Sequence, residues 1–246
     1  MPIPLDDGSG EQNHKPYVDT QGGSGEQEVQ VYVNEQDGNG EQLVYEPSDL
    51  PALPTIEDWE RPSPLDEYST VNGSAAVSST RAYNGSQSLK FTDAGQYIYS
   101  APGDGLGDYP EPGDRFQTFH WTTDASQYGV FELQFGGTDR DNCYVIQFNW
   151  DTGDLYIAKN ENGSISALAN VNVYGDGDTS IETWTGMDVD WGTNGGISVE
   201  LYQGATTLDT VSTTDTTYTS RGGWGYEWFN ASSNTPCYVD YTRLNY

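Results

Sequence analysis

Most of the candidate functional residues of this chain are aromatic. Their rings could bind a sugar by stacking against its ring. Phe, Trp and Tyr make up 13% of the 246 residues. A sugar site uses exposed rings as platforms, beside amide and carboxylate groups that hydrogen-bond to hydroxyls. The segment 221–230, RGGWGYEWFN, places Trp224, Tyr226 and Trp228 two residues apart in a glycine-rich stretch. These three rings are candidate glycan-binding residues.

A strand would put the three rings on one face, because successive side chains alternate between the faces of a sheet. That face is either an exposed platform or part of the core, and the sequence leaves both open. A second set of rings lies next to expected turns and forms the alternative platform: Trp121, Tyr128 and Trp150. A glycan is therefore the expected ligand, with six candidate stacking residues.

Two acidic, glycine-rich loops are the candidate metal sites. Residues 103–108 read GDGLGD and residues 175–178 read GDGD, and such loops can offer several oxygens to a hard cation. Calcium is the possible cofactor, and the candidate ligands are Asp176 and Asp178, followed by Asp104 and Asp108. Neither loop has EF-hand spacing, so solvated acidic loops are the alternative. His14 and His120 are isolated and indicate neither a triad nor a metal cluster.

Short β-strands must position these residues. From Tyr68 onward, apolar and polar residues alternate in segments such as 130–135 (VFELQF), 187–191 (MDVDW) and 197–201 (ISVEL), and glycine-rich turns separate them. No segment has a convincing helical pattern. Many short antiparallel strands of this kind predict an all-β fold, an antiparallel two-sheet jelly-roll sandwich.

The order of strands and turn phrases resembles a known superfamily. The phrases AYNGSQSLKF, YGVFELQFGGTDRDNCYVIQF, TGDLYIAKNENGS, WTGMDVDWGTNGGISVELYQG and YVDYTRL are similar to the concanavalin A-like lectin/glucanase superfamily, in particular its laminin-G-like branch. The resemblance covers roughly residues 68–246. It implies a concanavalin A-like sandwich, a rim that holds calcium in many members, and a lectin-like or glucanase activity.

The glucanase branch uses paired glutamates on one strand, in an E-x-D-x-E or E-x-D-x-x-E pattern. Retaining hydrolysis needs two carboxyl groups about 5.5 Å apart, which this spacing supplies. The pattern is missing here. Asp188 and Asp190 share one strand face, but their segment has no glutamate, and two acids at this spacing are expected by chance in so acidic a chain. We therefore expect no catalytic residues, with a glycan hydrolase or lyase as the alternative.

The first 50 residues contain a repeat with a period of fifteen. GSGEQ begins at Gly8 and Gly23, and GNGEQ begins at Gly38. A strict period shared by turn and apolar positions indicates a repeated turn-and-strand unit that buries little by itself. The pattern resembles the shafts of trimeric viral fibres. A disordered Gly/Glu/Gln linker is the alternative.

These patterns divide the chain into three parts. Residues 1–50 are expected to form the repeat arm, which anchors or oligomerises the protein. Residues 51–67 are rich in proline and are expected to be a linker or collar. Residues 68–246 form the expected sandwich. Cys143 and Cys237 form either one disulfide or two buried thiols.

The charge narrows the classes of function. The chain has 38 acidic and 9 basic residues, a formal net charge of −29. Molar salt would screen this self-repulsion, so the composition indicates salt adaptation. Nucleic-acid binding is not expected, because it requires clustered Lys and Arg. No membrane-spanning run and no export signal are recognisable in the sequence.

We therefore expect a virion structural protein: a tail fibre, capsid spike or turret of a tailed virus of a halophilic archaeon. Its arm would bind other virion proteins and its sandwich would attach to host-surface glycans. A homotrimer is the preferred assembly, with pentamers or hexamers as alternatives, and the location is the extracellular particle. A cell-surface adhesin is a further alternative.

Overall fold

The computed structural model describes residues 32–34, 41–43, 55–106, 108–122, 129–173, 182–229 and 235–245. The chain divides into two compact units, Met1–Ala52 and Leu53–Tyr246. In the first unit, β1 (Tyr32–Asn34) pairs antiparallel with β2 (Glu41–Leu43). The repeated phrases beginning at Gly8 and Gly23 lie outside the described residues. The fifteen-residue repeat arm therefore stays a prediction.

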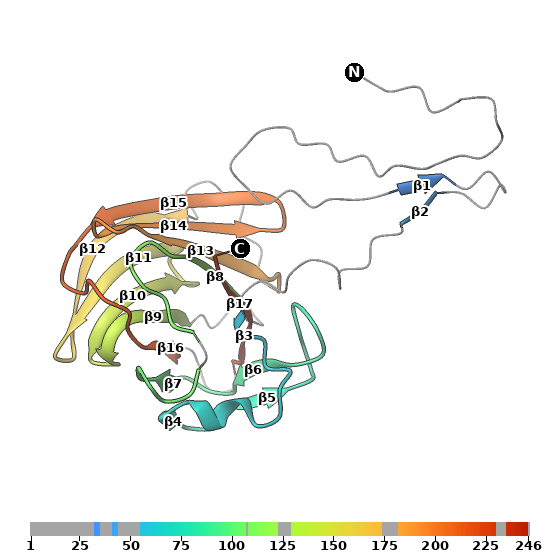
Figure 1. The fold of residues 1–246 in the computed structure, drawn as a ribbon, viewed down its shortest axis with the longest axis horizontal. Coiled ribbons are helices and arrows are strands. Elements are labelled where there is room, and N and C mark those ends of the chain that lie inside the picture. The colour runs from blue at the N-terminus through green and yellow to red at the C-terminus, as the bar shows by residue number, and fades with distance from the viewer. Residues whose placement is uncertain are drawn as a thin grey trace, which may run out of the picture. The chain divides into compact units, whose positions relative to one another are not determined.

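The second unit is an antiparallel sandwich of two sheets, as the alternation of apolar and polar residues predicts (Figure 1). The seven-stranded sheet has the order β12-β11-β10-β9-β16-β7-β4. Its strands, in chain order, are β4 (Thr70–Asn72), β7 (Gln96–Ser100), β9 (Val130–Asp139), β10 (Asn142–Asn149), β11 (Asp154–Glu161), β12 (Ser164–Asn172) and β16 (Trp224–Phe229).

The eight-stranded sheet has the order β15-β14-β13-β8-β17-β6-β5, and β3 pairs with β17 beside it. Its strands are β3 (Thr55–Glu57), β5 (Ala76–Ser78), β6 (Ser88–Phe91), β8 (Arg115–Thr122), β13 (Thr185–Trp191), β14 (Gly196–Gln203), β15 (Thr206–Thr214) and β17 (Cys237–Leu244). A short 3-10 helix, η2 (Pro64–Glu67), follows β3. None of the helices in the described part of the chain is long and apolar enough to cross a membrane.

The core lies between the sheets and is rich in aromatic residues. Alternate residues of β9, namely Phe131, Leu133 and Phe135, are fully buried in it. The ring of Phe135 makes an edge contact with Trp191 of the opposite sheet, at 5.2 Å between centroids. Burial of such rings stabilises the sandwich through their large apolar area.

Four of the predicted stacking residues are part of this core: Trp150, Trp224, Tyr226 and Trp228. All four are fully buried, so they do not form an exposed platform, and for Trp224, Tyr226 and Trp228 the core alternative applies. The rings of Trp224, Tyr226 and Trp228 share one face of β16, as predicted, and that face is turned toward the opposite sheet. Trp121 lies outside the core cluster but is only 1% exposed. Arg81 lies 3.6 Å from the centre of its ring, and Tyr238 makes an edge contact with it at 5.6 Å. Tyr128 lies outside the described residues.

Residues 55–67 belong to the sandwich, so this part of the segment expected to be a linker or collar (51–67) is not a free linker. The ring of Trp59 is fully buried and stacks on Tyr68 at 5.8 Å. The Glu57 carboxylate accepts the backbone N–H of Trp59 at 2.9 Å and pairs with Arg61 at 2.5 Å. The prolines do not prevent pairing, because none of them lies within β3: Pro51 and Pro54 precede the strand in the sequence, Pro62 follows it and Pro64 begins η2. Residues 51–54 lie outside the described part.

Both cysteines are free and buried. Cys143 lies in β10 of the seven-stranded sheet and Cys237 in β17 of the eight-stranded sheet. The structure therefore agrees with the alternative of two buried thiols, and the disulfide is not formed.

Candidate functional site

A row of polar and aromatic side chains crosses the outer face of the seven-stranded sheet, with one residue from every strand. Because Phe131, Leu133 and Phe135 face the core, the residues between them face away from it. Strand register places the members of the row opposite one another across the sheet: Asn72, Tyr97, Glu227, Glu132, Gln147, Tyr156 and Asn170. Strands lie about 4.8 Å apart, so the row is roughly 29 Å long.

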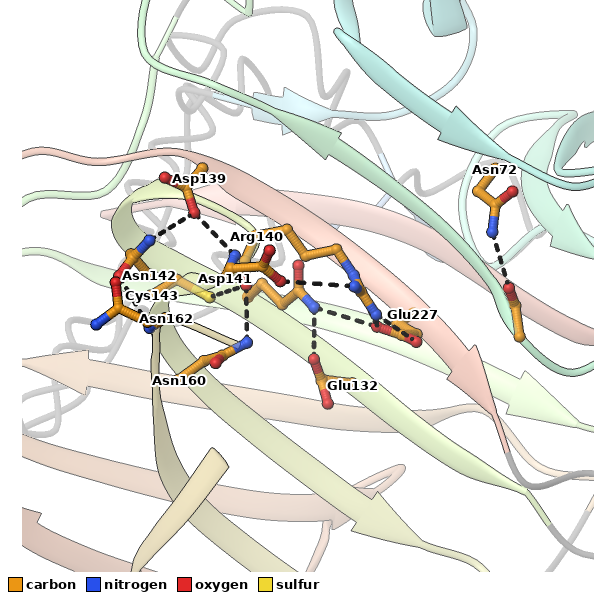
Figure 2. A network of polar contacts seen from close by, with 12 residues as sticks. Asn72, Glu132, Asp139, Arg140, Asp141, Asn142, Cys143, Asn160, Asn162 and Glu227 are labelled. Carbon is orange, nitrogen blue, oxygen red and sulfur yellow. Dashed lines mark hydrogen bonds and ion pairs between the residues drawn. The ribbon is translucent and has the colours of Figure 1, made fainter. Parts of the chain in front are cut away.

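Two glutamates form the centre of this row. Glu132 of β9 and Glu227 of β16 are direct cross-strand partners. The Gln134 amide lies between them and donates to Glu132 Oε1 at 2.5 Å and to Glu227 Oε2 at 3.4 Å. Gln147 Nε2 donates to Glu132 Oε2 at 2.7 Å. These contacts form one hydrogen-bonded network, most of which is drawn in Figure 2.

Arg140 folds over the network from the turn between β9 and β10 (Figure 2). Its guanidinium donates to both carboxylate oxygens of Glu227, with Nη2 distances of 2.8 and 2.6 Å. The same group lies 4.1 Å from the centre of the Tyr97 ring, a cation–π contact. Its side chain remains 34% exposed. Arg140 therefore offers part of its guanidinium to solvent while it covers the glutamate pair.

The turn that carries Arg140 is held in place by its neighbours. The Arg140 carbonyl accepts Asn160 Nδ2 at 3.0 Å, and Asp139 Oδ1 accepts the backbone N–H of Asp141 at 2.9 Å. The β9–β10 pairing is irregular just before this turn. A Cβ on Gly137 would lie 1.7 Å from the Asn142 carbonyl oxygen, so only glycine permits this close approach.

Burial controls the electrostatics of the pair. Glu132 is only 2% exposed, and this burial raises the pKa of its carboxyl group from 4.5 to about 7. The hydrogen bond from Gln147 acts in the opposite direction, and the nearby Glu227 charge adds to the increase. Glu132 therefore exchanges its proton near neutral pH and can serve as a hydrogen-bond donor or acceptor.

The remaining predicted residues do not join this site. Asp104 Oδ2 accepts the backbone N–H of Ala101 at 2.6 Å, and Asp108 pairs with Arg221 at 2.9 Å. Among the described residues, no three His, Cys, Asp or Glu side chains gather where they could hold a metal ion. Asp176 and Asp178 lie outside the described part, and calcium stays a prediction.

Asp188 and His120, which the sequence also singled out, lie away from the glutamate network. Asp188 forms a two-point ion pair with Arg115 on the other sheet, so it does not act with Asp190 as a carboxylate pair. His120 is fully buried against Phe131, and burial lowers the pKa of its imidazole to about 3. It is a neutral core side chain.

Sequence reasoning missed Glu132, Gln134, Glu227 and Arg140. A signal was present in the alternation itself. Once the rings around Glu227 are assigned to the core, the glutamate between Tyr226 and Trp228 must face outward. The same alternation in VFELQF turns Glu132 and Gln134 outward. Their meeting across two strands is a property of the sheet order, which the sequence does not state.

Comparisons with known structures agree with this architecture. The chain is similar to a carbohydrate-binding module (CBM66) from Bacillus subtilis, with a TM-score of 0.52 and 13% identity over 72% of this chain and 94% of the module. It is also similar to a legume lectin-like domain from Entamoeba histolytica, with a TM-score of 0.52 and 11% identity over 79% of this chain and 97% of the domain. At these identities the likeness shows the fold, a lectin-like jelly-roll sandwich.

A third similar structure is an endo-β-1,4-glucuronan lyase from Trichoderma reesei, with a TM-score of 0.46 and 11% identity over 72% of this chain and 90% of the lyase. No protein-family model and no curated protein sequence matches the chain.

Proposed function

We propose that the sandwich is a glycan-binding domain and that the outer face of the seven-stranded sheet is its binding face. The observation that carries this proposal is the row of hydrogen-bonding and aromatic side chains that crosses all seven strands. A carbohydrate presents many hydroxyls that both donate and accept, and the row offers amides, tyrosine rings and the partly exposed Arg140 guanidinium above the buried carboxylates. The fold shared with a carbohydrate-binding module and a lectin-like domain supports the proposal.

The energetics of the network also support a binding role. Buried ion pairs cost desolvation energy, and well-packed apolar residues in their place are often equally stable or more so. Glu132 and Gln134 are each at most 2% exposed on the outward side of the sheet, where the two-sheet core gains nothing from them. Gln134 Oε1 has no hydrogen-bond partner among the described residues, so this polar network is better explained by a ligand than by folding.

The charge of the protein favours a neutral glycan. With a net charge of −29, the surface repels polyanions, and Arg140 is already engaged by Glu227. Hydroxyl groups remain good ligands under these conditions, because they bind carboxylates as donors and the guanidinium as acceptors.

We further propose the finer role expected from the sequence, that of a fibre, spike or turret protein in the virion of a salt-adapted archaeal virus. The fifteen-residue repeats and the acidic composition support it. In this role the arm oligomerises the protein, as a trimer by preference, and attaches it to the particle. The sandwich then faces the host surface.

The arm can be tested by truncation. Deletion of residues 1–52 removes the first compact unit and leaves β3 intact, so the product should fold as a monomer in molar salt. Deletion of residues 1–67 also removes Trp59 and should prevent stable folding, since that buried ring is lost. Light scattering measures the mass of each product. A fully oligomeric 53–246 fragment would contradict the role of the arm.

The glutamate pair favours glycoside hydrolysis as a second candidate function. The carboxylic acid of Glu132 would protonate the leaving oxygen, while the Glu227 carboxylate would stabilise positive charge at the anomeric carbon. The two-point pairing of Glu227 with Arg140 weakens this candidate, because it neutralises the second carboxylate.

Release of reducing ends from polysaccharides separates the two functions. We expect binding without release. Release that is lost in Glu132→Gln and kept in the exposed control Glu161→Gln would instead establish the hydrolase.

A further inference from the structure

The outer face of the eight-stranded sheet carries a cluster of five aromatic rings, which we call the aromatic patch: Tyr83, Phe119, Trp184, Tyr202 and Tyr241. The Tyr83 ring stacks on Phe119 with centroids 3.6 Å apart, and it meets Trp184 edge-on at 5.8 Å. Tyr202 makes an edge contact with Phe119 at 5.8 Å. Tyr83 is 45% exposed, whereas Phe119 beneath it is buried. The patch therefore presents a ring face to solvent over a fixed support.

Asp240 fixes the position of the exposed rings. Its fully buried carboxylate accepts the backbone N–H groups of Tyr83 at 2.6 Å, of Asn84 at 3.0 Å and of Tyr241 at 2.8 Å. The register of β17 shifts directly after Asp240, and Tyr241 has a φ of 52°. A tyrosine in the left-handed region is strained, and such strain is concentrated at functional positions.

A polar hollow adjoins the patch. Its volume is about 260 Å³, and its lining includes Tyr202, Gln117, Asp188, Glu200 and Thr207. Arg115 also lines it and pairs with Asp188, while Thr207 donates to Glu200 at 2.6 Å. The Gln117 amide lies 3.3 Å from the Tyr202 hydroxyl, which connects the hollow to the patch.

We propose that this patch and hollow form a second carbohydrate site, which takes a single residue of a neutral saccharide. The face of the sugar ring stacks on Tyr83, and its hydroxyls hydrogen-bond to the carboxylates and amide of the hollow. The hollow lies just below the usual 300–1,000 Å³ range of ligand pockets, so it suits one sugar unit better than a long chain. The acidic lining excludes a polyanion.

This second site is independent of the first face. Its residues lie on β8, β13, β14, β15 and β17, in the loop around Tyr83 and just before β13 at Trp184, whereas the first row lies on the seven-stranded sheet. Absence of glycan binding at one face therefore does not imply its absence at the other.

Saturation-transfer NMR with the full chain in molar KCl tests the second site. The probes are four neutral polysaccharides: mannan, β-glucan, galactan and xylan. The measurement is made in the Tyr97→Ala background, which impairs the first face. Four additional substitutions are compared: Tyr83→Ala removes the platform, Ala205→Trp fills the hollow from an exposed turn, Tyr83→Phe keeps the ring, and Ile165→Ala is an exposed control on β12.

We expect Tyr97→Ala protein to retain binding to at least one probe. Tyr83→Ala and Ala205→Trp should each weaken that binding at least about tenfold, the loss of roughly one ring contact. Ile165→Ala should leave it unchanged, and Tyr83→Phe, which keeps the ring, should weaken it less than Tyr83→Ala. If Tyr83→Ala fails to fold, as judged by near-ultraviolet circular dichroism, Ala205→Trp decides. Absence of binding in the Tyr97→Ala background, or unchanged binding after Ala205→Trp, would overturn the proposal.

Discussion

Replacing Trp59 by alanine should lower the free energy of unfolding by about 3–5 kcal/mol, the usual cost of deleting a large buried ring. Trp59 is fully buried, stacks on Tyr68 and contacts Tyr226 at 6.2 Å. Its ring packs the segment before β4 against the core, so its removal should destabilise the whole sandwich. Urea denaturation in molar KCl measures the effect.

A matched control is Ile165→Ala, because Ile165 is 48% exposed on β12. Its removal should change the free energy of unfolding by less than about 0.5 kcal/mol. A loss below about 1 kcal/mol for Trp59→Ala would contradict the assignment of residues 55–67 to the sandwich and would restore the linker interpretation.

Glu132→Gln should stabilise the protein at alkaline pH and have little effect in acid. The pKa of Glu132 is about 7 in the folded protein and about 4.5 when exposed, so the unfolded state ionises first. Stability is therefore lost as pH rises from about 4.5 to about 7, by at most about 3 kcal/mol. Glutamine removes this penalty, but its single side-chain oxygen can accept only one of the two amide hydrogen bonds that Glu132 accepts. We therefore expect the free energy of unfolding to increase by about 1–3 kcal/mol at about pH 8.

The difference between wild type and variant isolates Glu132 from other groups. Burial also raises the pKa of Glu57 to about 7 and that of Asp240 to about 6, so the wild-type curve contains several contributions in this range. Unfolding curves between about pH 4.5 and pH 8 give the comparison. A difference that does not grow with pH would show that Glu132 is not buried as an acid, and Glu161→Gln serves as the exposed control.

The sequence predicted the strands well, because alternation depends on neighbouring residues alone. In VFELQF the residues Phe131, Leu133 and Phe135 face the core as alternation requires. Alternation alone does not show which face of β16 is covered by the other sheet. The sequence therefore did not decide whether Trp224, Tyr226 and Trp228 are exposed or buried. The ring of Trp121 is contacted by Arg81 and Tyr238, which are distant in the sequence and which no local pattern connects to it.

The candidate site was harder to predict, for the same reason. Glu132 and Glu227 meet only because β9 and β16 are neighbours in the sheet, although many residues separate them in the chain. Arg140 reaches them through a turn whose shape depends on Gly137. The proline-rich segment misled in another way, because its prolines flank β3 in the sequence and none of them lies within it.

The central claim is that the outer face of the seven-stranded sheet binds a glycan. The most direct measurement is a calorimetric titration of the full chain with the same four neutral polysaccharides, comparing wild type, a Tyr97→Ala/Gln147→Ala double variant and Ser212→Ala, an exposed control on β15 of the other sheet. We expect the affinity of the double variant for at least one polysaccharide to fall at least about tenfold, while Ser212→Ala binds as wild type. Equal affinity in the double variant, or no binding by wild type, would contradict the claim.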